Sequence, residues 1–175
     1  MLPPRYLCSL PNVKGTGTPR EVFDADHDTV AEFIRQENVP GRGVYYCIGE
    51  IAAGARRRCK ETIVALPCMV CDLDLRKMPR EQAIVRLKQL ILPPTEIRDS
   101  GRGLHAVWEF KEPMTDEAEI AETEACMKAL AHMLGGDPLP THRAALLRLP
   151  GTRNSKANGN PTCRTIWHID GRDLI

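Results

Sequence analysis

Two aspartates lie two residues apart at the end of an apolar stretch. Residues 61–77 read ETIVALPCMVCDLDLRK, and this β-branched run closes with Asp72 and Asp74. The pattern predicts a buried strand whose last residues emerge at a sheet edge or cleft. Because side chains at positions i and i+2 share one face of a strand, we expect the two carboxylates side by side.

Neighbouring carboxylates at the end of a buried strand repel each other and resist desolvation. Such a pair usually persists because a cation lies between the acids, most often a divalent metal with oxygen ligands. The alternative is a solvated strand end at which the acids pair with Arg76 and Lys77. This stretch alone leaves both interpretations open.

A glycine-rich turn at residues 100–105, SGRGLH, leads into a strand on which His105, Val107 and Glu109 share one face. Glycines allow backbone amides to approach an anion, and Arg102 and His105 add charge-assisted donors. Glycine turns are common in hairpins, and a single histidine is more often structural than functional. By itself this motif therefore decides nothing.

One more acid and several cations complete the set of candidates. Asp137 directly follows a Gly-Gly pair at the end of a predicted helix, where its simplest role is that of a turn residue. Arg148, Arg153 and Lys156 lie in a strand and the polar turn after it. Singly these are surface charges. Together, three acids and several phosphate-directed cations form the set that nucleotidyl transfer requires.

A basic connection precedes the acidic strand. We expect the strand before this connection, at 44–48, and the strand at 63–74 to form an antiparallel hairpin with the connection as its tip. Its simplest interpretation is a solvated charge cluster, and its functional alternative is a flexible loop that meets phosphates of the template or the triphosphate. The basic residues are Arg56, Arg57, Arg58 and Lys60.

The elements that must position these residues follow from apolar spacing and β-branched content. Strands and helices are mixed without a regular βα alternation, so we expect an α+β fold with a largely antiparallel sheet. Helices are expected at 23–37, 78–92 and 115–134, and strands at 5–10, 44–48, 63–74, 95–98, 104–110, 144–149 and 164–169.

The composition is that of an ordinary globular protein. The 175 residues fit a single domain, and 42% hydrophobic and 27% charged residues are typical values. The net charge of +1 gives no overall signature of nucleic-acid binding, so any basic surface must be local. No apolar run approaches the roughly 20 residues that span a bilayer, and the N-terminus lacks signal-peptide features. We therefore expect a cytoplasmic protein without a membrane partner.

The seven cysteines are expected to stay reduced in that compartment. Cys68 and Cys71 have metal-like spacing, but residues i and i+3 of a strand face opposite sides. No second cysteine pair accompanies them, so we interpret both as buried core thiols.

The ordered combination of hhDhD, SGxGxH and an Asp before RLPGTxNxK resembles the archaeo-eukaryotic primase superfamily. It is most similar to the primase-polymerase branch of plasmids, phages and integrated elements, over about residues 44–169. The resemblance implies an RRM-like catalytic module with a mostly antiparallel sheet, packed against a second small α/β unit. We expect one catalytic domain over residues 1–175. The end of the chain soon after the last predicted strand leaves open that it is the N-terminal part of a longer replication protein with a helicase or accessory helical domain.

Carried over onto this sequence, the resemblance assigns Asp72, Asp74 and Asp137 to two Mg²⁺ or Mn²⁺ ions, which in such sites lie about 4 Å apart. For the third acid, Asp99, Glu109 and Asp116 compete with Asp137. The family often has Ser or Thr two residues before its histidine, whereas this chain has Gly103 there. The resemblance and the basic motifs assign Ser100, Arg102, His105, Arg148 and Lys156 to nucleotide binding, and Arg56, Arg57, Arg58, Lys60 and Arg153 to the nucleic acid.

The resulting hypothesis is a primase-polymerase that makes primers on single-stranded DNA from dNTPs or NTPs. One ion would lower the pKa of the attacking 3′-hydroxyl, and the other would neutralise charge on the leaving pyrophosphate. Two alternatives remain: a metal-dependent nuclease, and a non-catalytic replication-initiator module that binds nucleic acid. A nuclease has less reason to carry a His–Arg–Lys triphosphate site, and three intact acids argue against a non-catalytic module.

Overall fold

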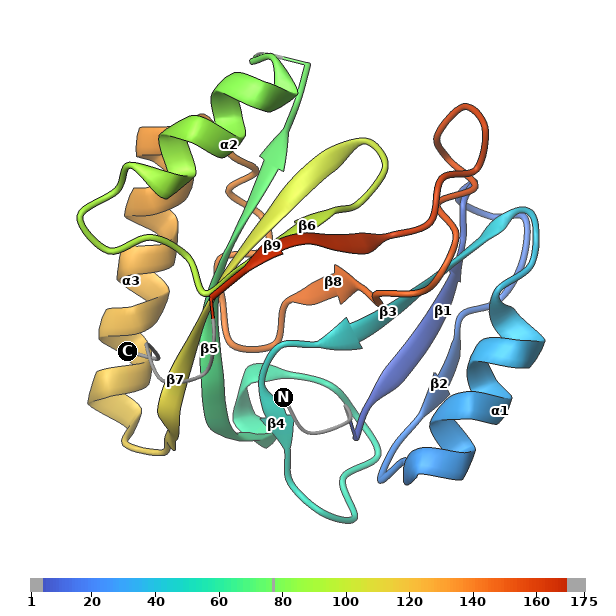
Figure 1. The fold of residues 1–175 in the computed structure, drawn as a ribbon. Coiled ribbons are helices and arrows are strands. Elements are labelled where there is room, and N and C mark those ends of the chain that lie inside the picture. The colour runs from blue at the N-terminus through green and yellow to red at the C-terminus, as the bar shows by residue number, and fades with distance from the viewer. Residues whose placement is uncertain (1–4, 77, 170–175) are drawn as a thin grey trace.

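The computed structural model describes residues 5–76 and 78–169, which form two antiparallel sheets and three α-helices (Figure 1). The helices are α1 (His27–Glu37), α2 (Arg80–Lys88) and α3 (Glu117–Leu134), and a 3₁₀ turn lies at Lys60–Thr62. The strands are β1 (Leu7–Pro11), β2 (Arg20–Val22), β3 (Arg42–Cys47), β4 (Glu50–Ile51), β5 (Ile63–Asp74), β6 (Glu96–Asp99), β7 (Gly103–Met114), β8 (Leu146–Arg148) and β9 (Arg164–His168).

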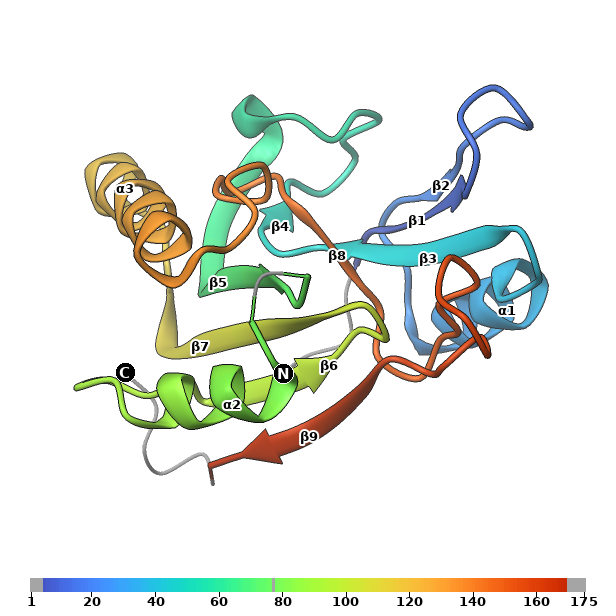
Figure 2. The same ribbon diagram turned by 90° about the horizontal axis from the view of Figure 1, so that it is seen from above.

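The two sheets have separate helical partners. The four-stranded sheet has the order β2-β1-β3-β8, and the five-stranded sheet has the order β4-β5-β7-β6-β9. Figure 2 shows α1 beside the smaller sheet and α2 and α3 beside the larger one. The predicted α+β class, with a mostly antiparallel sheet packed against a second small α/β unit, is confirmed.

The larger sheet has the RRM-like arrangement expected from the sequence. Its elements follow the order β5-α2-β6-β7-α3, as in ferredoxin-like split βαβ units. The long strands β5 and β7 pair antiparallel from Asp74 opposite Gly103 to Met69 opposite Trp108. These two strands therefore carry the first two sequence motifs side by side.

The predicted hairpin between the strand at 44–48 and β5 is wrong. β3 pairs with β1 and β8 in the smaller sheet, so both of its edges are occupied. The short β4 takes the place beside β5 instead. The chain crosses between the sheets at Gly49, where a Cβ atom would lie 2.5 Å from the Arg143 carbonyl oxygen. Residue composition predicted the strand correctly but carried no information about its partner.

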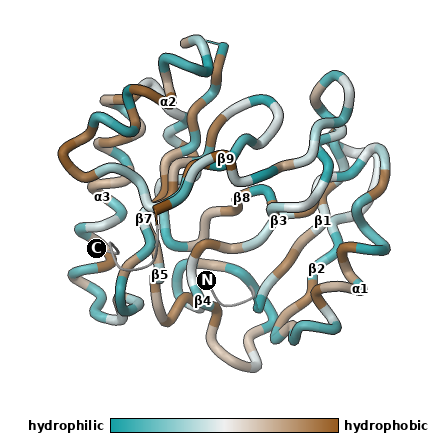
Figure 3. The backbone as a smooth tube through the Cα atoms, in the orientation of Figure 1, coloured by the Kyte–Doolittle hydropathy of each residue, from teal (hydrophilic) through white to brown (hydrophobic). Residues whose placement is uncertain are grey.

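Two helix boundaries differ from the prediction for local reasons. α1 begins after Asp26, whose carboxylate accepts a hydrogen bond from the Thr29 amide at 2.8 Å and so caps the helix. α2 ends at Lys88 rather than at 92, and the Leu92 carbonyl accepts a hydrogen bond from Trp108 Nε1. The loop after α2 is strongly apolar in Figure 3, yet Ile91 is fully exposed rather than part of the buried stripe. The strand β2 was not predicted.

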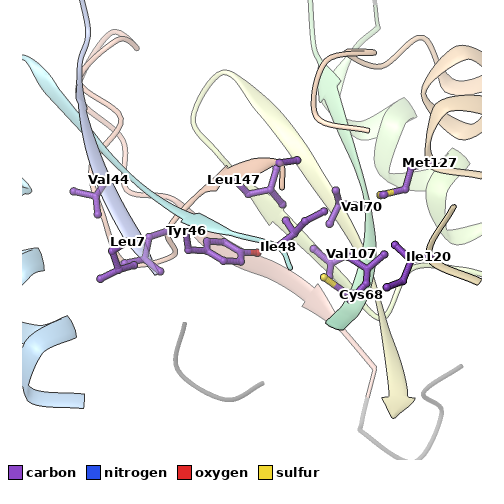
Figure 4. Packing of buried hydrophobic residues seen from close by; sticks show 13 residues of the cluster. Leu7, Val44, Tyr46, Ile48, Cys68, Val70, Val107, Ile120, Met127 and Leu147 are labelled. Carbon is purple, nitrogen blue, oxygen red and sulfur yellow. The ribbon is translucent and has the colours of Figure 1, made fainter. Parts of the chain in front are cut away.

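Alternate residues of β5 face different layers. Leu66, Cys68 and Val70 belong to a core cluster between the two sheets (Figure 4), whereas Cys71 and Leu73 pack toward α2 and α3. The two cysteines are therefore free, buried thiols on opposite faces, as predicted, and burial raises the pKa of each to about 12.

No helix in the described part of the chain is long and apolar enough to cross a membrane.

Candidate active site

Three charged or polar side chains lie in a row across the larger sheet. Asp72 of β5 is directly opposite His105 of β7, and His105 is directly opposite Arg98 of β6. Asp72 is two residues after Val70, so the two side chains share one face of β5. Val70 packs toward the smaller sheet, and the row of polar side chains lies on the same face. Arg98 donates a short hydrogen bond to the Tyr46 hydroxyl of β3, which places this row between the two sheets. The apolar core thus gives way to a polar site near the end of β5.

The Asp72 carboxyl lies in a repulsive environment. Its side chain is 31% exposed, and its pKa is raised to about 7 by burial and then by the charges of Asp137 and Asp74. Like charges held close together favour the protonated acid. These three acids, which are far apart in the sequence, therefore lie close enough to interact electrostatically.

The end of α3 delivers Asp137 to this position. The helix ends at Gly135, whose φ of 72° is the left-handed conformation of a helix C-cap. At Gly136 a Cβ atom would lie 2.7 Å from the Asp72 carbonyl oxygen, so only glycine fits without a shift. The Asp137 amide then donates a hydrogen bond of 2.7 Å to the same oxygen.

Asp74 differs from Asp72 because it already has a cationic partner. Its Oδ2 accepts a hydrogen bond from Arg76 Nε at 2.7 Å, and its Oδ1 accepts one from the Arg76 amide at 3.0 Å. The bonds from Arg76 hold the pKa of Asp74 below its usual range. The pairing with Arg76 that the sequence left open is therefore present, and Lys77 lies outside the described residues.

His105 is buried and uncharged. Only 4% of the residue is exposed, and burial, helped by the charges of Arg98 and Arg148, lowers its pKa to about 3. Its Nε2 lies 3.9 Å from Asp72 Oδ1, but with a neutral imidazole this contact is not an ion pair. Its Nδ1 has no hydrogen-bond partner. A buried, unsatisfied ring nitrogen is costly unless a ligand uses it.

Arg148 is held in place by the smaller sheet. Its guanidinium lies 4.9 Å from the centre of the Tyr45 ring and donates hydrogen bonds to the Tyr45 hydroxyl at 3.0 Å and to the Arg153 carbonyl at 2.9 Å. Burial, followed by the nearby charges of Arg148 and Arg102, lowers the pKa of Lys156. Three cations from two separate sequence motifs are thus close enough to repel one another.

Ser100 and Asn154 hold the two basic turns together. Ser100 Oγ donates a hydrogen bond of 3.1 Å to the Gly103 carbonyl, so the hydroxyl closes its own turn. Asn154 Nδ2 donates a hydrogen bond of 2.6 Å to the Ser100 carbonyl. This role of Asn154 was not predicted from the sequence. Asn side chains in turns often bond backbone groups, and Asn154 is buried in a turn that contains Gly151.

The acids that compete with Asp137 are engaged elsewhere. Asp99 pairs with Arg80 and accepts a hydrogen bond from the Gly101 amide at 2.8 Å. Asp116 caps the opposite end of α3, where it accepts a hydrogen bond from the Ala118 amide. Glu109 is paired in register with Cys68, four residues along β5 from Asp72 and so about 13 Å away.

The basic connection is not beside the acids. It precedes β5 near β4, whereas Asp72 and Asp74 lie at the other end of β5, about 30 Å from Ile63 at the usual rise per residue (Figure 1). Arg58 donates a short hydrogen bond to the Ala144 carbonyl, and Lys60 pairs with Glu124 at 3.0 Å. Of the four cations, Arg56, Arg57 and Lys60 are exposed.

The acids have the donor chemistry of a magnesium or manganese site. Carboxylate oxygens are the ligands these ions prefer. A cation would stabilise the charged form of Asp72, which burial and then the charges of Asp137 and Asp74 disfavour. In the described residues no three His, Cys, Asp or Glu side chains are already gathered as a metal centre. The residues fit the ions, provided that the Asp74 carboxylate turns away from Arg76.

The fold has counterparts among solved structures. The AEP domain of the cyanophage S-2L primase-polymerase (PrimPol) matches with a TM-score of 0.69 and 15% identity, over 98% of this chain and 83% of that one. The catalytic domain of primase RepB′ in complex with initiator DNA matches with a TM-score of 0.61 and 16% identity, over 94% and 78%. A second structure of primase RepB′ matches with a TM-score of 0.59 and 16% identity, over 94% of this chain and 52% of that one.

No protein-family model matches the chain, and no curated protein matches it in sequence. At these identities the likeness concerns the fold, and it is the primase-polymerase fold that the sequence motifs predicted.

Proposed function

We propose that this chain, which shares the fold of primase-polymerase catalytic domains, joins nucleotides into primers on a single-stranded DNA template. The observation that carries the proposal is that the Asp137 amide is hydrogen-bonded to the Asp72 carbonyl, at the end of β5 that also bears Asp74. Beside them lie His105 and the turns that bear Arg148 and Lys156. An acidic centre next to a cationic surface suits metal-assisted transfer of a nucleotide from its triphosphate.

In this proposal the three aspartates hold two Mg²⁺ or Mn²⁺ ions. Such ions activate the attacking 3′-hydroxyl and neutralise charge on the leaving pyrophosphate. Asp72, whose pKa is raised to about 7, gives up its remaining proton when it becomes a ligand. The hydrogen bond between the Asp137 amide and the Asp72 carbonyl keeps the two backbones in register.

The triphosphate of a dNTP or NTP is bound by the cations and by His105. A neutral His105 donates one N–H group, while Arg148 and Lys156 supply charge-assisted bonds. Arg102, at the exposed tip of its turn, faces the same ligand. Ser100 stabilises the turn rather than contacting the triphosphate, because its hydroxyl donates a hydrogen bond to the Gly103 carbonyl.

We propose the template contacts from the charge of the exposed arginines and from the DNA complex of RepB′. Arg153 is exposed next to the nucleotide site, and Arg56 and Arg57 are exposed about 30 Å along β5. That separation is too great for one triphosphate, so a template strand is the ligand we assign to them. Arg58 and Lys60 instead bond the Ala144 carbonyl and Glu124 and so hold the connection in place. A helicase or an accessory helical domain would be a further partner of this catalytic domain, either in the same polypeptide or as a separate protein.

The test is primer synthesis by the variant Asp72→Ala/Asp74→Ala with labelled dNTPs or NTPs, Mn²⁺ and single-stranded DNA. We expect synthesis to fall to background while the circular dichroism spectrum is unchanged. Asp28→Ala, which removes a fully exposed acid of α1, is the control and should synthesise normally. Near-normal synthesis by the double variant would refute the proposal. Degradation of labelled DNA without incorporation by the wild type would instead favour the nuclease.

A further inference from the structure

Arg76 binds the carboxylate of Asp74 from both sides. The residue follows β5 by two positions, and its backbone amide and its guanidinium each bond a different carboxylate oxygen. The Arg76 side chain is 78% exposed, so nothing but Asp74 holds it there among the described contacts. The pair is therefore local, solvent-accessible and free to open.

This pairing conflicts with metal binding by Asp74. A divalent ion needs lone pairs of the carboxylate oxygens, and the guanidinium fork occupies the same region. In contrast, no arginine or lysine among the described residues forms an ion pair with Asp72, whose carboxylate lies 3.9 Å from the neutral His105 ring. One acid of the proposed metal site is thus open, and the other is closed by a cation of the chain itself.

We infer that Arg76 is a displaceable counter-ion, which closes the metal site at Asp74 until the triphosphate of a nucleotide offers the guanidinium another anion. The inference rests on the proposed function and adds an order of events to it. Metal and nucleotide then favour each other's binding. The triphosphate draws Arg76 away from Asp74 and so frees the carboxylate for the metal, and the metal at Asp74 frees Arg76 for the triphosphate. When metal and nucleotide are both bound, Arg76 helps to position the triphosphate.

The charges around the site are consistent with this exchange. Arg102 lies near enough to Asp74 to favour its charged form, although no hydrogen bond or ion pair joins the two in the described structure. Arg76 and Arg102 therefore flank the same carboxylate from two turns, and only Arg76 blocks it.

The inference predicts opposite effects of one substitution on two ligands. Arg76→Ala should strengthen the binding of Mn²⁺ to the nucleotide-free protein by about 2- to 5-fold, the range of an exposed ion pair. The same variant should weaken the binding of a non-hydrolysable nucleotide analogue in its Mn²⁺ complex, because a phosphate contact is lost. Both affinities are measured by calorimetry, so no activity is needed.

Arg102→Ala is the matched control, because it removes an exposed positive charge near Asp74 without breaking a pair. It should strengthen Mn²⁺ binding clearly less than Arg76→Ala does. Arg76→Lys keeps the charge but not the fork and should give an intermediate value. Equal effects of Arg76→Ala and Arg102→Ala on Mn²⁺ binding would overturn the inference, as would an unchanged Mn²⁺ affinity or unweakened analogue binding in Arg76→Ala. Absence of Mn²⁺ binding by the wild type would remove the metal site and with it the proposed function.

Discussion

Asp72 and His105 face each other across two strands with pKa shifts opposite to those of an ion pair. The pKa of the acid is raised to about 7, and the pKa of the base is lowered to about 3. Burial is the first cause in both cases, since it disfavours whichever form is charged. Near neutral pH the site therefore contains an acid that is only partly ionised beside a neutral imidazole. This arrangement lowers the stability of the folded protein, but it favours the binding of a cation.

The cost should appear as a pH-dependent gain in stability of Asp72→Asn. An acid whose pKa is higher in the folded state stabilises the fold below the unfolded pKa near 4 and loses this contribution as pH rises through about 7. We expect the variant to exceed the wild type by roughly 2–4 kcal/mol at pH 8 and by little at pH 4, after allowance for partial exposure. Urea unfolding in EDTA measures the difference.

The comparison between variant and wild type isolates Asp72 from His105. A base with a lowered pKa gives its stability above pH 6.5 and loses it on acidification, which is the opposite trend in part of the same range. That contribution is common to both proteins and largely cancels. A difference that is constant from pH 4 to pH 8 would show that the pKa of Asp72 is not raised.

Single residues were also where the sequence was most informative. The period of two in a strand predicted that Asp72 and Asp74 lie on one face, and the charge of Asp74 is the third cause, after burial and Asp137, of the raised pKa of Asp72. The sequence offered a metal or a pairing with Arg76 as alternatives, whereas the structure contains the pairing and also the acids that a metal would need. Asn154 was missed because its partner, the Ser100 carbonyl, is 54 residues away.

At the scale of elements, the site depends on how closely α3 approaches β5. The approach occurs at Gly136, where a methyl group would meet the Asp72 carbonyl and the Cys71 sulfur. The Gly-Gly pair predicted the end of the helix, but not this contact. Its two glycines have different tasks, since Gly135 adopts a positive φ and Gly136 provides room.

Gly136→Ala should displace Asp137 and reduce primer synthesis by roughly 100-fold, the usual effect of an ångström-scale misplacement of a catalytic group. Gly135→Ala is the control: its φ makes the change cost about 1–2 kcal/mol, but no atom lies within 4 Å of the new methyl group. It should lose stability and keep most of its synthesis. Equal losses of synthesis in both variants would mean that the close approach at Gly136 does not position the acid.

Helices and strands were predicted well where they depend on the residues of a single segment. Strand pairing was predicted poorly, because it depends on contacts between distant segments. The helix at 115–134 matches α3 closely because caps and apolar spacing lie within the segment. The hairpin of residues 44–48 with β5 failed because pairing is a property of the whole sheet, in which β1 and β8 occupy both edges of β3.

At the scale of the whole molecule, one core joins the two sheets. Leu7, Val44 and Leu147 of the smaller sheet belong to the same buried cluster as Val70 and Val107 of the larger one (Figure 4). A shared core makes independent unfolding of the sheets unfavourable. It also fixes Arg148, carried by β8, relative to the acids of β5.

Leu7→Ala tests this coupling from a position far from the tryptophans. Both tryptophans, Trp108 and Trp167, belong to the larger sheet, so their fluorescence reports on that sheet alone. The truncation should cost about 2–5 kcal/mol and shift the fluorescence and circular dichroism transitions equally. Val13→Ala, at an exposed site, should shift neither. A fluorescence transition that stays at its wild-type midpoint would show that the sheets unfold separately.

The most direct measurement is a crystal structure of the protein with Mn²⁺ and a non-hydrolysable nucleoside triphosphate. We predict two ions bound by the carboxylates of Asp72, Asp74 and Asp137, and a triphosphate in contact with His105 and with the turns that bear Arg148 and Lys156. A nucleotide bound elsewhere on the molecule, or manganese that leaves Asp72 and Asp137 without a ligand bond, would contradict the proposed active site.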